Sequence, residues 1–354
     1  MRFRPTLVRN NSVWTRFQSL NSLSLLTRIK TRPIRAFPPR LGGQILGATF
    51  ASDFFTIVNM FKSLAIGLRL LIMLSFCGLT ASGQRYAHER EEWNKPFKPF
   101  RIAGNLYYVG ATGVSAFLIT TTEGSILIDG GLPETAPLIE KNISDLGFKI
   151  TDIKYLLNSH AHFDHAGGLA ELQRLSGAQM IASAGDSQTL RTGIDTVLGP
   201  SGSFPAIKID RVISDNDTVQ LGGMTLTAHL TPGHTRGSTT WTTRISENGK
   251  TYRVLFHSST TVAANKLVNN HEYPNIISDY EASFAKFKKL SCDIFLAPHG
   301  SFFHLTEKLK KRAANNSNPF IDPNELQRFV NQSEMDFKRE LREQKSKSER
   351  PPQN

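Results

Sequence analysis

Hydrophobic side chains recur along the middle of this chain in short runs, each bounded by glycines or polar residues. Continuous or alternating apolar runs of this length predict β-strands. The first predicted strands are Asn105–Val109, Val114–Thr120, Ser125–Ile128 and Ile153–Leu157. Later ones are predicted at Gln179–Ser183, Met224–Leu230, Thr239–Arg244, Arg253–Phe256 and Ile294–Ala297.

Apolar residues at helical spacing lie between and after these runs. Helices are predicted at Pro133–Leu146, after Gly168, at Ser278–Leu290 and at Pro323–Glu343. Gly147 follows the first of them, where a C-terminal cap residue is expected. The charged end, Lys338–Asn354, is predicted to be a frayed tail. Because strands and helices alternate, the pattern indicates α/β or mixed layers.

The net charge of +12 is concentrated at the start of the chain. Residues 1–83 hold 11 Lys and Arg against one acid, Asp53, whereas the rest holds 31 basic and 29 acidic residues. A nucleic-acid-binding protein normally keeps its basic residues on the folded domain. The charge pattern therefore argues against a nucleic-acid partner.

Residues 60–83 are typical of a secretory signal peptide. Met60 and Lys62 open it, residues 70–77 form an apolar centre, and Ala81-Ser-Gly83 supplies small residues for cleavage. The apolar run is shorter than the roughly 20 residues of a membrane span. We therefore expect a periplasmic or secreted protein with no stable membrane span after processing, and a folded catalytic domain over residues 84–354.

Residues 1–59 are rich in Arg and Ser, with no acid before Asp53. This composition is typical of a mitochondrial transit peptide, but upstream DNA translated from a misassigned start would read the same way. We favour the misassigned start, because a complete signal peptide with its own Met60 follows directly. Under either explanation, residues 1–59 are expected to be a disordered upstream extension.

Only two cysteines occur, Cys77 and Cys292, so neither a disulfide framework nor a cysteine-rich zinc cluster is possible. Cys292 precedes an apolar run and is expected to be a buried, inert thiol.

A cluster of metal-ligand side chains directly follows the predicted strand Ile153–Leu157. It contains His160, His162, Asp164 and His165 within six residues. Imidazole and carboxylate are the ligands that zinc prefers when thiolates are absent. Two more histidines, His234 and His299, each follow a later apolar strand. Together the six could form two sets of three protein ligands, each leaving a position for water as catalytic zinc does.

These residues resemble the metallo-β-lactamase superfamily, and the similarity extends from about Trp93 to the C-terminal helix. The resemblance implies an α+β fold, a four-layer αβ/βα sandwich. It also implies two Zn²⁺ ions, the first bound by His160, His162 and His234 and the second by Asp164, His165 and His299. Leu127-Ile-Asp129-Gly-Gly131 is similar to the family's early strand-turn motif. Asp129 there either orients a ligand from a second layer or caps the turn.

The branch of the family is suggested by the segment Leu255–Thr261. Thioesterases and lactonases of the family place a metal-bridging Asp there, and first-subclass lactamases place a Cys, but this segment contains neither. Ser259 and Thr261 are similar to the substrate-binding pair of third-subclass class B β-lactamases; alternatively, they are polar residues of a surface loop. Loops around Trp93 and Thr189–Phe204 are expected to set substrate selectivity.

Two departures from the family pattern stand out. Some members close a disulfide from a Cys matching Cys292, but no second Cys is present here, so the C-terminal helix is expected to be held by packing alone. Several relatives have Asp at the position of Ser258, which is expected to alter water ordering near the second metal.

The resemblance implies hydrolysis of penicillins, cephalosporins and carbapenems by water activated between two zinc ions, and hence antibiotic resistance. Asp164 would orient the nucleophile or handle its proton. A thioesterase or lactonase of the same fold is the alternative enzyme. A zinc-binding protein that has lost catalysis is the alternative outside enzymes, although the complete ligand set argues against it.

Overall fold

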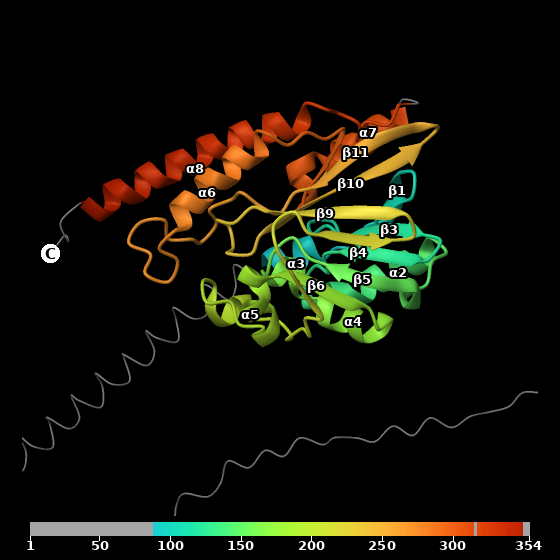
Figure 1. Ribbon diagram of the computed structural model, residues 1–354, viewed down its shortest axis with the longest axis horizontal. Coiled ribbons are helices and arrows are strands. Elements are labelled where there is room, and N and C mark those ends of the chain that lie inside the picture. Colours follow the sequence, from blue (N-terminus) through green and yellow to red (C-terminus); the bar gives the residue numbers. More distant parts are fainter. Residues whose placement is uncertain (1–87, 315–316, 350–354) are drawn as a thin grey trace, which may run out of the picture. The chain divides into compact units, whose positions relative to one another are not determined.

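Two β-sheets form the middle of the part of the chain that the computed structural model describes, residues 88–314 and 317–349 (Figure 1). The seven-stranded sheet has the order β1-β2-β3-β4-β5-β6-β7 and the five-stranded sheet the order β12-β11-β10-β9-β8. Strands β1 to β4 pair antiparallel and β4 to β7 pair parallel. In the smaller sheet, β8 to β11 pair antiparallel, and β12 runs parallel to β11.

The first sheet consists of β1 (Phe100–Ala103), β2 (Leu106–Tyr108), β3 (Phe117–Thr121), β4 (Gly124–Ile128), β5 (Ile153–Leu157), β6 (Gln179–Ser183) and β7 (Arg211–Ile213). The second consists of β8 (Thr218–Leu221), β9 (Met224–Leu230), β10 (Thr239–Glu247), β11 (Lys250–Phe256) and β12 (Ile294–Leu296). The helices are α2 (Ala136–Asp145), α3 (Phe163–Ala166), α4 (Leu169–Ser176), α5 (Ala184–Thr192), α6 (Ile276–Phe287), α7 (Leu305–Ala314) and α8 (Glu325–Glu349).

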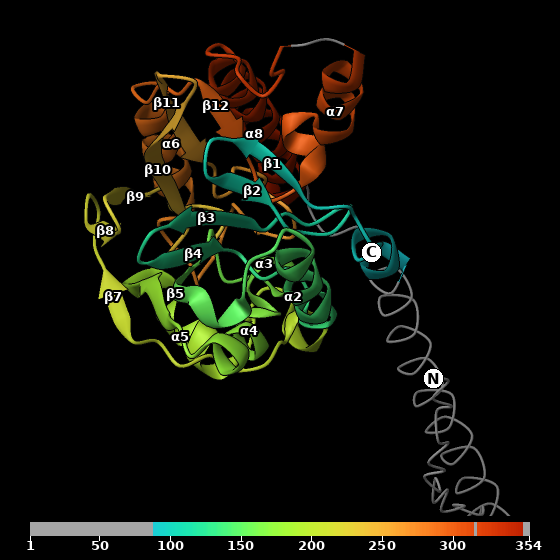
Figure 2. The ribbon, with the colours of Figure 1, turned by 90° about the vertical axis from the view of Figure 1, so that its right-hand side faces the viewer.

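The sheets lie face to face, and helices cover the outer face of each (Figure 2). Helices α2, α4 and α5 lie on the outer side of the first sheet, while α6 and α8 lie on the outer side of the second (Figures 1 and 2). This arrangement is the predicted α+β, four-layer sandwich. Because both faces of each sheet are covered, strands such as β4 and β6 are buried along nearly their whole length.

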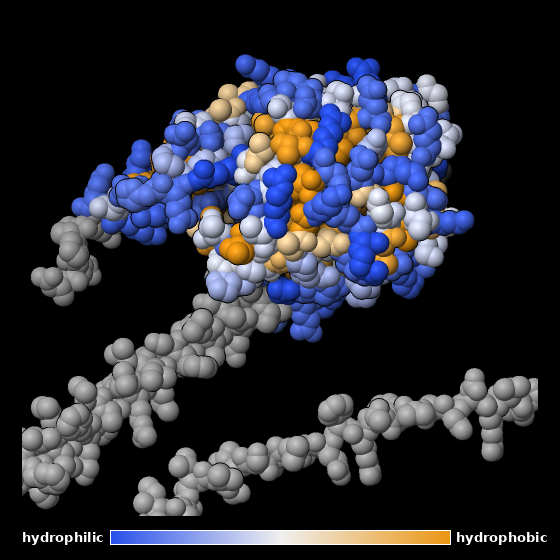
Figure 3. Space-filling model, turned by 60° about the horizontal axis from the view of Figure 1, so that its bottom comes forward, coloured by the Kyte–Doolittle hydropathy of each residue, from blue (hydrophilic) through white to orange (hydrophobic). Residues whose placement is uncertain are grey.

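Two apolar cores lie between these layers. One lies between the sheets and continues around α6 and α8, with Trp241, Phe117 and Phe284 among its members. The other lies between the first sheet and α2, α4 and α5, with Leu127 and Ile143 among its members. On the face shown in Figure 3, the exposed hydrophobic side chains form patches that hydrophilic side chains separate from one another.

Most predicted elements are present, with shifted ends. The helix predicted at Pro133–Leu146 begins as a 3₁₀ turn and continues as α2, and Gly147 follows it with φ +85°. The strand predicted from Val114 starts only at Phe117, and Val114 instead forms an isolated bridge with His299. The elements β1, β7, β8, α3, α5 and α7 were missed. The strands and α3 are only three or four residues long, too short to show a periodic pattern, and α5 and α7 carry few large apolar residues.

The prediction of a frayed tail from Lys338 was wrong as far as Glu349. Helix α8 continues through Glu349, and Gln344 near its end binds the backbone of a loop. Gln344 Oε1 accepts the N–H of Leu267 at 2.7 Å, and Gln344 Nε2 donates to the carbonyl of Asn265 at 3.2 Å. The charged sequence after Lys338 therefore continues the helix, and Gln344 ties this part of α8 to the loop around Asn265.

The expectation that packing alone holds the C-terminal helix was also wrong. Lys308 of α7 and Glu325 of α8 form a buried ion pair. Cys292 is buried and free, as predicted, and burial raises the pKa of its thiol to about 12. Polar contacts at both ends of α8 therefore supplement its apolar packing.

The predicted signal peptide (60–83) and the upstream extension (1–59) lie outside the described residues. Within the described part, no helix combines the length and the apolar character needed to cross a bilayer.

Candidate metal centre

Three loops, each following a strand, bring the six predicted ligands together. His160 and His162 follow β5, and Asp164 and His165 lie in the short helix α3 directly behind them. His234 lies between β9 and β10, and His299 follows β12. Because these strands belong to both sheets, the ligands meet at an edge of the sandwich.

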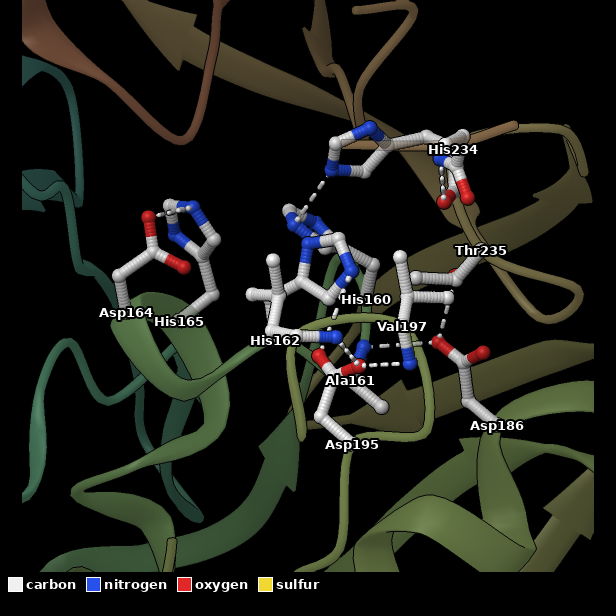
Figure 4. Close-up of polar contacts among 12 residues, drawn as sticks. His160, Ala161, His162, Asp164, His165, Asp186, Asp195, Val197, His234 and Thr235 are labelled. Carbon is white, nitrogen blue, oxygen red and sulfur yellow. Dashed lines mark hydrogen bonds and ion pairs between the residues drawn. The ribbon is translucent and has the colours of Figure 1, made fainter. Parts of the chain in front are cut away.

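The first set, His160, His162 and His234, is tightly grouped and buried. One nitrogen from each ring lies within 4.8 Å of the others. His160 Nε2 and His234 Nε2 are 3.2 Å apart, and Figure 4 shows the contact between the two rings. The structure therefore brings together three imidazoles that lie up to 74 residues apart in the sequence.

The second set is built around Asp164. Its Oδ2 lies 3.2 Å from His165 Nε2 and 3.3 Å from His299 Nε2. Asp164 and His165 also lie close to His160, with one ligand atom of each within 4.8 Å of the others. His299 joins this group through its direct contact with Asp164.

Backbone carbonyls fix the orientation of two of the rings. His234 Nδ1 lies 2.7 Å from the carbonyl of Thr261, and His299 Nδ1 lies 2.9 Å from that of Gly113. A carbonyl only accepts, so each Nδ1 carries a proton and Nε2 is directed into the site. This second-layer arrangement is the one that metal-binding histidines commonly have.

The charges of these side chains also fit a cation. Burial, together with the neighbouring histidines, holds the pKa of His160 and of His234 well below the usual value, so both rings are neutral. Burial alone would raise the pKa of Asp164, but His165 and His299 hold it well below its usual value. Neutral imidazoles and an ionised carboxylate are the forms that bind metal. The donor set therefore fits metal ions.

Asp129 supports the loop that carries His160. It follows β4 with φ +65°, and its Oδ1 accepts the N–H of Ser159 at 2.6 Å. Burial raises the pKa of this carboxyl to about 6, although His165 and the hydrogen bonds from Ser159 oppose the rise. Asp129 thus holds the backbone beside the first ligand, while its role in orienting a ligand stays a prediction.

Asp186 of α5 links the two loops of the first set. Its Oδ2 accepts the N–H of Ala161 at 2.8 Å and the hydroxyl of Thr235 at 2.9 Å, and its Oδ1 accepts the N–H of Gly237 at 2.8 Å (Figure 4). Ala161 lies between His160 and His162. A single buried carboxylate therefore ties both histidine-bearing loops together.

A glycine allows the loop of His234 to approach helix α6. Gly233 has φ +132°, and a Cβ there would lie 2.7 Å from the ring of Tyr280. The Tyr280 hydroxyl donates to the Thr261 carbonyl at 2.7 Å, the same oxygen that orients His234.

A cavity of about 390 Å³ opens over the six side chains. Ser259 and Thr261 line it, with their hydroxyl oxygens 3.2 Å apart. Trp93 also lines it and lies against His299, with 5.3 Å between ring centroids. The volume is in the range of pockets for small molecules. The predicted substrate-binding pair thus lies in a cavity wall, beside the candidate ligands.

The side chain of Ser258, in contrast, is turned away from this cavity. It is fully buried, with its hydroxyl 2.8 Å from that of Thr231 and 3.3 Å from that of Thr240. The expectation that Ser258 alters water ordering near the second metal therefore has no support in its position.

Sequence reasoning missed three polar residues that support the site: Asp186, Asp195 and Asn265. Asn265 Nδ2 donates to the carbonyl of His234 at 3.0 Å. Each contacts a partner at least 25 residues away in the sequence. The one available signal was the position of Asp186 just after a predicted strand, where loops gather at a site.

Comparisons with known proteins agree with this geometry. A family model described as the metallo-beta-lactamase superfamily matches residues 109–248. The structure is similar to a subclass B3 metallo-beta-lactamase of Bradyrhizobium japonicum, with 40% identity and a TM-score of 0.71 over 73% of this chain and 98% of that one. It is also similar to a native metallo-beta-lactamase of Legionella gormanii, with 41% identity and a TM-score of 0.68 over 71% of this chain and 98% of that one.

Matches to curated proteins are shorter. A hydroxyacylglutathione hydrolase of Rhodospirillum rubrum is 32% identical over 105 residues, which is 30% of this chain and 34% of that protein. The chain thus spans about a third of the length of this relative.

Proposed function

Since the chain belongs to the metallo-beta-lactamase superfamily, we propose that it is a zinc-dependent hydrolase that opens the amide bond of β-lactams. The proposed substrates are penicillins, cephalosporins and carbapenems, and the biological result is antibiotic resistance. The observation that carries the proposal is the position of Ser259 and Thr261. Two hydroxyl groups line the cavity of the six ligands, in the segment where other branches place a bridging acid.

Two zinc ions are the proposed cofactors. When bound, zinc ions supply Lewis-acid charge and lower the pKa of a coordinated water towards neutrality. His160, His162 and His234 would hold one ion, and Asp164, His165 and His299 the other. Imidazole and carboxylate donors favour zinc over Mg²⁺ or Ca²⁺, which prefer oxygen ligands.

The chain's own residues position water and substrate. Asp164 stays ionised at neutral pH, because the low pKa of its carboxyl reflects contacts with His165 and His299. An ionised carboxylate accepts a hydrogen bond from water and thereby orients it, and it can take up a proton. Ser259 and Thr261 can donate to the carboxylate that β-lactams carry, which fixes the ring over the site.

We also propose that the enzyme acts in the periplasm or as a secreted protein. This proposal rests on the predicted signal peptide, residues 60–83.

A second candidate is a thioesterase or lactonase of the same fold. The curated matches favour it, because they include hydroxyacylglutathione hydrolases and an N-acyl homoserine lactonase. The absence of an acid from Leu255–Thr261 argues against it.

One substrate comparison separates these candidates. The purified protein is assayed with a chromogenic cephalosporin, a glutathione thioester and an acyl homoserine lactone, with and without a chelator. We expect the cephalosporin to be opened and the chelator to stop the reaction. Turnover of the thioester or the lactone alone would instead establish the second candidate.

Two ligand variants and a control link the activity to the site. Asp164→Ala and His299→Ala should each largely abolish turnover. His271→Ala, which removes an exposed histidine outside the cavity, should leave turnover unchanged. Near-normal rates in the first two variants would remove the assignment of the second metal.

A further inference from the structure

A buried carboxylate, Asp195, lies beside the candidate ligand His162. Asp195 follows α5 and is only 3% exposed. Its Oδ2 lies 3.7 Å from His162 Nε2 and has no hydrogen-bond partner among the described residues (Figure 4). A buried carboxylate oxygen without a donor is unusual in a native protein, and it calls for an explanation.

The ring of His162 offers that explanation. With Nε2 directed at Asp195, the other ring nitrogen, Nδ1, is the one available to a metal. A carboxylate oxygen only accepts, so at 3.7 Å from Asp195 Oδ2 a proton on His162 Nε2 is favoured over a lone pair there. A neutral imidazole that carries its proton on Nε2 has its lone pair on Nδ1. The position of Asp195 therefore selects the tautomer of His162 that can bind a cation through Nδ1.

The second oxygen of Asp195 holds a wall of the substrate cavity. Asp195 Oδ1 accepts the N–H of Val197 at 2.8 Å and that of Leu198 at 2.9 Å. Both residues line the 390 Å³ cavity, and the side chain of Val197 is exposed. The two bonds fix the turn that carries these two cavity-lining residues.

The neighbouring Asp186 has no carboxylate oxygen that lacks a hydrogen-bond donor. Its two oxygens together accept three hydrogen bonds, and all three come from backbone or hydroxyl groups. Asp186 thus holds the loops, whereas Asp195 has an oxygen left for an imidazole.

We propose that Asp195 is a positioning residue that orients His162 for metal binding with one oxygen and fixes the Val197–Leu198 wall of the substrate cavity with the other. This inference rests on the proposed function for its metal and its substrate. It predicts that one side chain affects metal affinity and substrate binding separately, through different atoms.

Two substitutions separate the two roles. In Asp195→Asn, the amide oxygen still accepts the N–H groups of Val197 and Leu198, but the NH₂ group opposes the proton on His162 Nε2. Asp195→Ala removes both interactions. Asp322→Asn is the matched control, because Asp322 also accepts the backbone N–H two residues further on and does not line the cavity.

Zinc affinity is measured by competition with a chromophoric chelator, and KM is measured with a chromogenic cephalosporin. A cooperative urea-unfolding transition of each metal-free variant shows that the variant is folded. We expect Asp195→Asn to weaken zinc binding about 10–100-fold with little change in KM. Asp195→Ala should weaken zinc binding equally and raise KM as well, while the control matches the wild type.

Zinc binding by folded Asp195→Asn that is as tight as in the wild type would overturn the proposal for His162. An unchanged KM in Asp195→Ala would overturn the proposal for the cavity wall. If the wild type binds zinc, Asp195→Asn loses it, and no β-lactam is opened, the proposed substrate fails and the role of Asp195 towards His162 stands.

Discussion

The buried ion pair between Lys308 and Glu325 gives the sharpest prediction about stability. The two side chains are 7% and 5% exposed, and the Lys308 ammonium also lies over the rings of Phe303 and Phe320. Burial lowers the pKa of Lys308 and raises that of Glu325, although each group is opposed by its partner. For each group, the loss of hydration on burial therefore shifts the pKa more than the opposite charge of its partner does. Without that partner, the remaining charge would be still less favourable.

Removing one partner leaves the other charge buried and unpaired, which costs about 3–5 kcal/mol. Lys308→Met keeps an unbranched apolar stem against Phe303 and Phe320 and removes only the charge. For a domain of this size, the loss corresponds to a fall in Tm of roughly 6–20 °C, from about 2–4 °C for each kcal/mol. Replacing both partners, as in Lys308→Met with Glu325→Leu, should recover most of the loss, because no unpaired charge remains.

The assay is urea unfolding of the wild type, the single variants Lys308→Met and Glu325→Leu, and the double variant. Lys141→Met is the control, because Lys141 pairs with Asp145 on an exposed helix surface, where a pair contributes about 0–1 kcal/mol. The reasoning would be refuted if either single variant lost less than about 1 kcal/mol of its free energy of unfolding. It would also be refuted if the loss in the double variant equalled the sum of the two single losses.

Three further changes test other parts of the structure. Gln344→Ala frees the loop around Asn265 and should raise KM for a cephalosporin. Gln332→Ala, on the exposed side of α8, should leave KM unchanged. Equal KM values in the two variants would show that Gln344 does not hold this loop in place. Burial lowers the pKa of His257 to about 3, so the unfolded chain binds an extra proton below pH 6.5 and stability falls as the pH drops from 6.5 towards 3. His257→Phe should remove up to about 1.4 kcal/mol per pH unit of that slope in urea unfolding, and an unchanged slope would contradict the assignment. Asp186→Asn leaves one of three donors unpaired and should weaken zinc binding about tenfold or more in chelator competition; wild-type affinity would show that the loops need no such link.

The sequence was sufficient to predict the parts of this molecule that depend on local patterns. Strands such as Ile153–Leu157 and Gln179–Ser183 were predicted with their observed ends, because most of their residues are apolar and buried. The convergence of His160 with His234 and His299 followed from their positions after strands and from the family resemblance.

The supporting residues could not be predicted, because their roles depend on partners that only the fold brings near. Asp195 and Asp186 are ordinary acids of a loop and a short helix until His162 and the backbone of Gly237 are placed beside them. Gln344 lies in a run of charges that reads as a solvated tail, yet its side chain meets the backbone 77 residues earlier. Tertiary contacts of this kind leave no periodic pattern in a sequence.

The central claim is that six side chains from three loops form two metal sites in one cavity. Equilibrium dialysis with zinc measures the number of ions bound to each chain in the wild type, His234→Ala and His299→Ala. The account predicts two zinc ions in the wild type and the loss of one in each variant. A wild type that binds no zinc, or a His299→Ala variant that binds as much as the wild type, would contradict it.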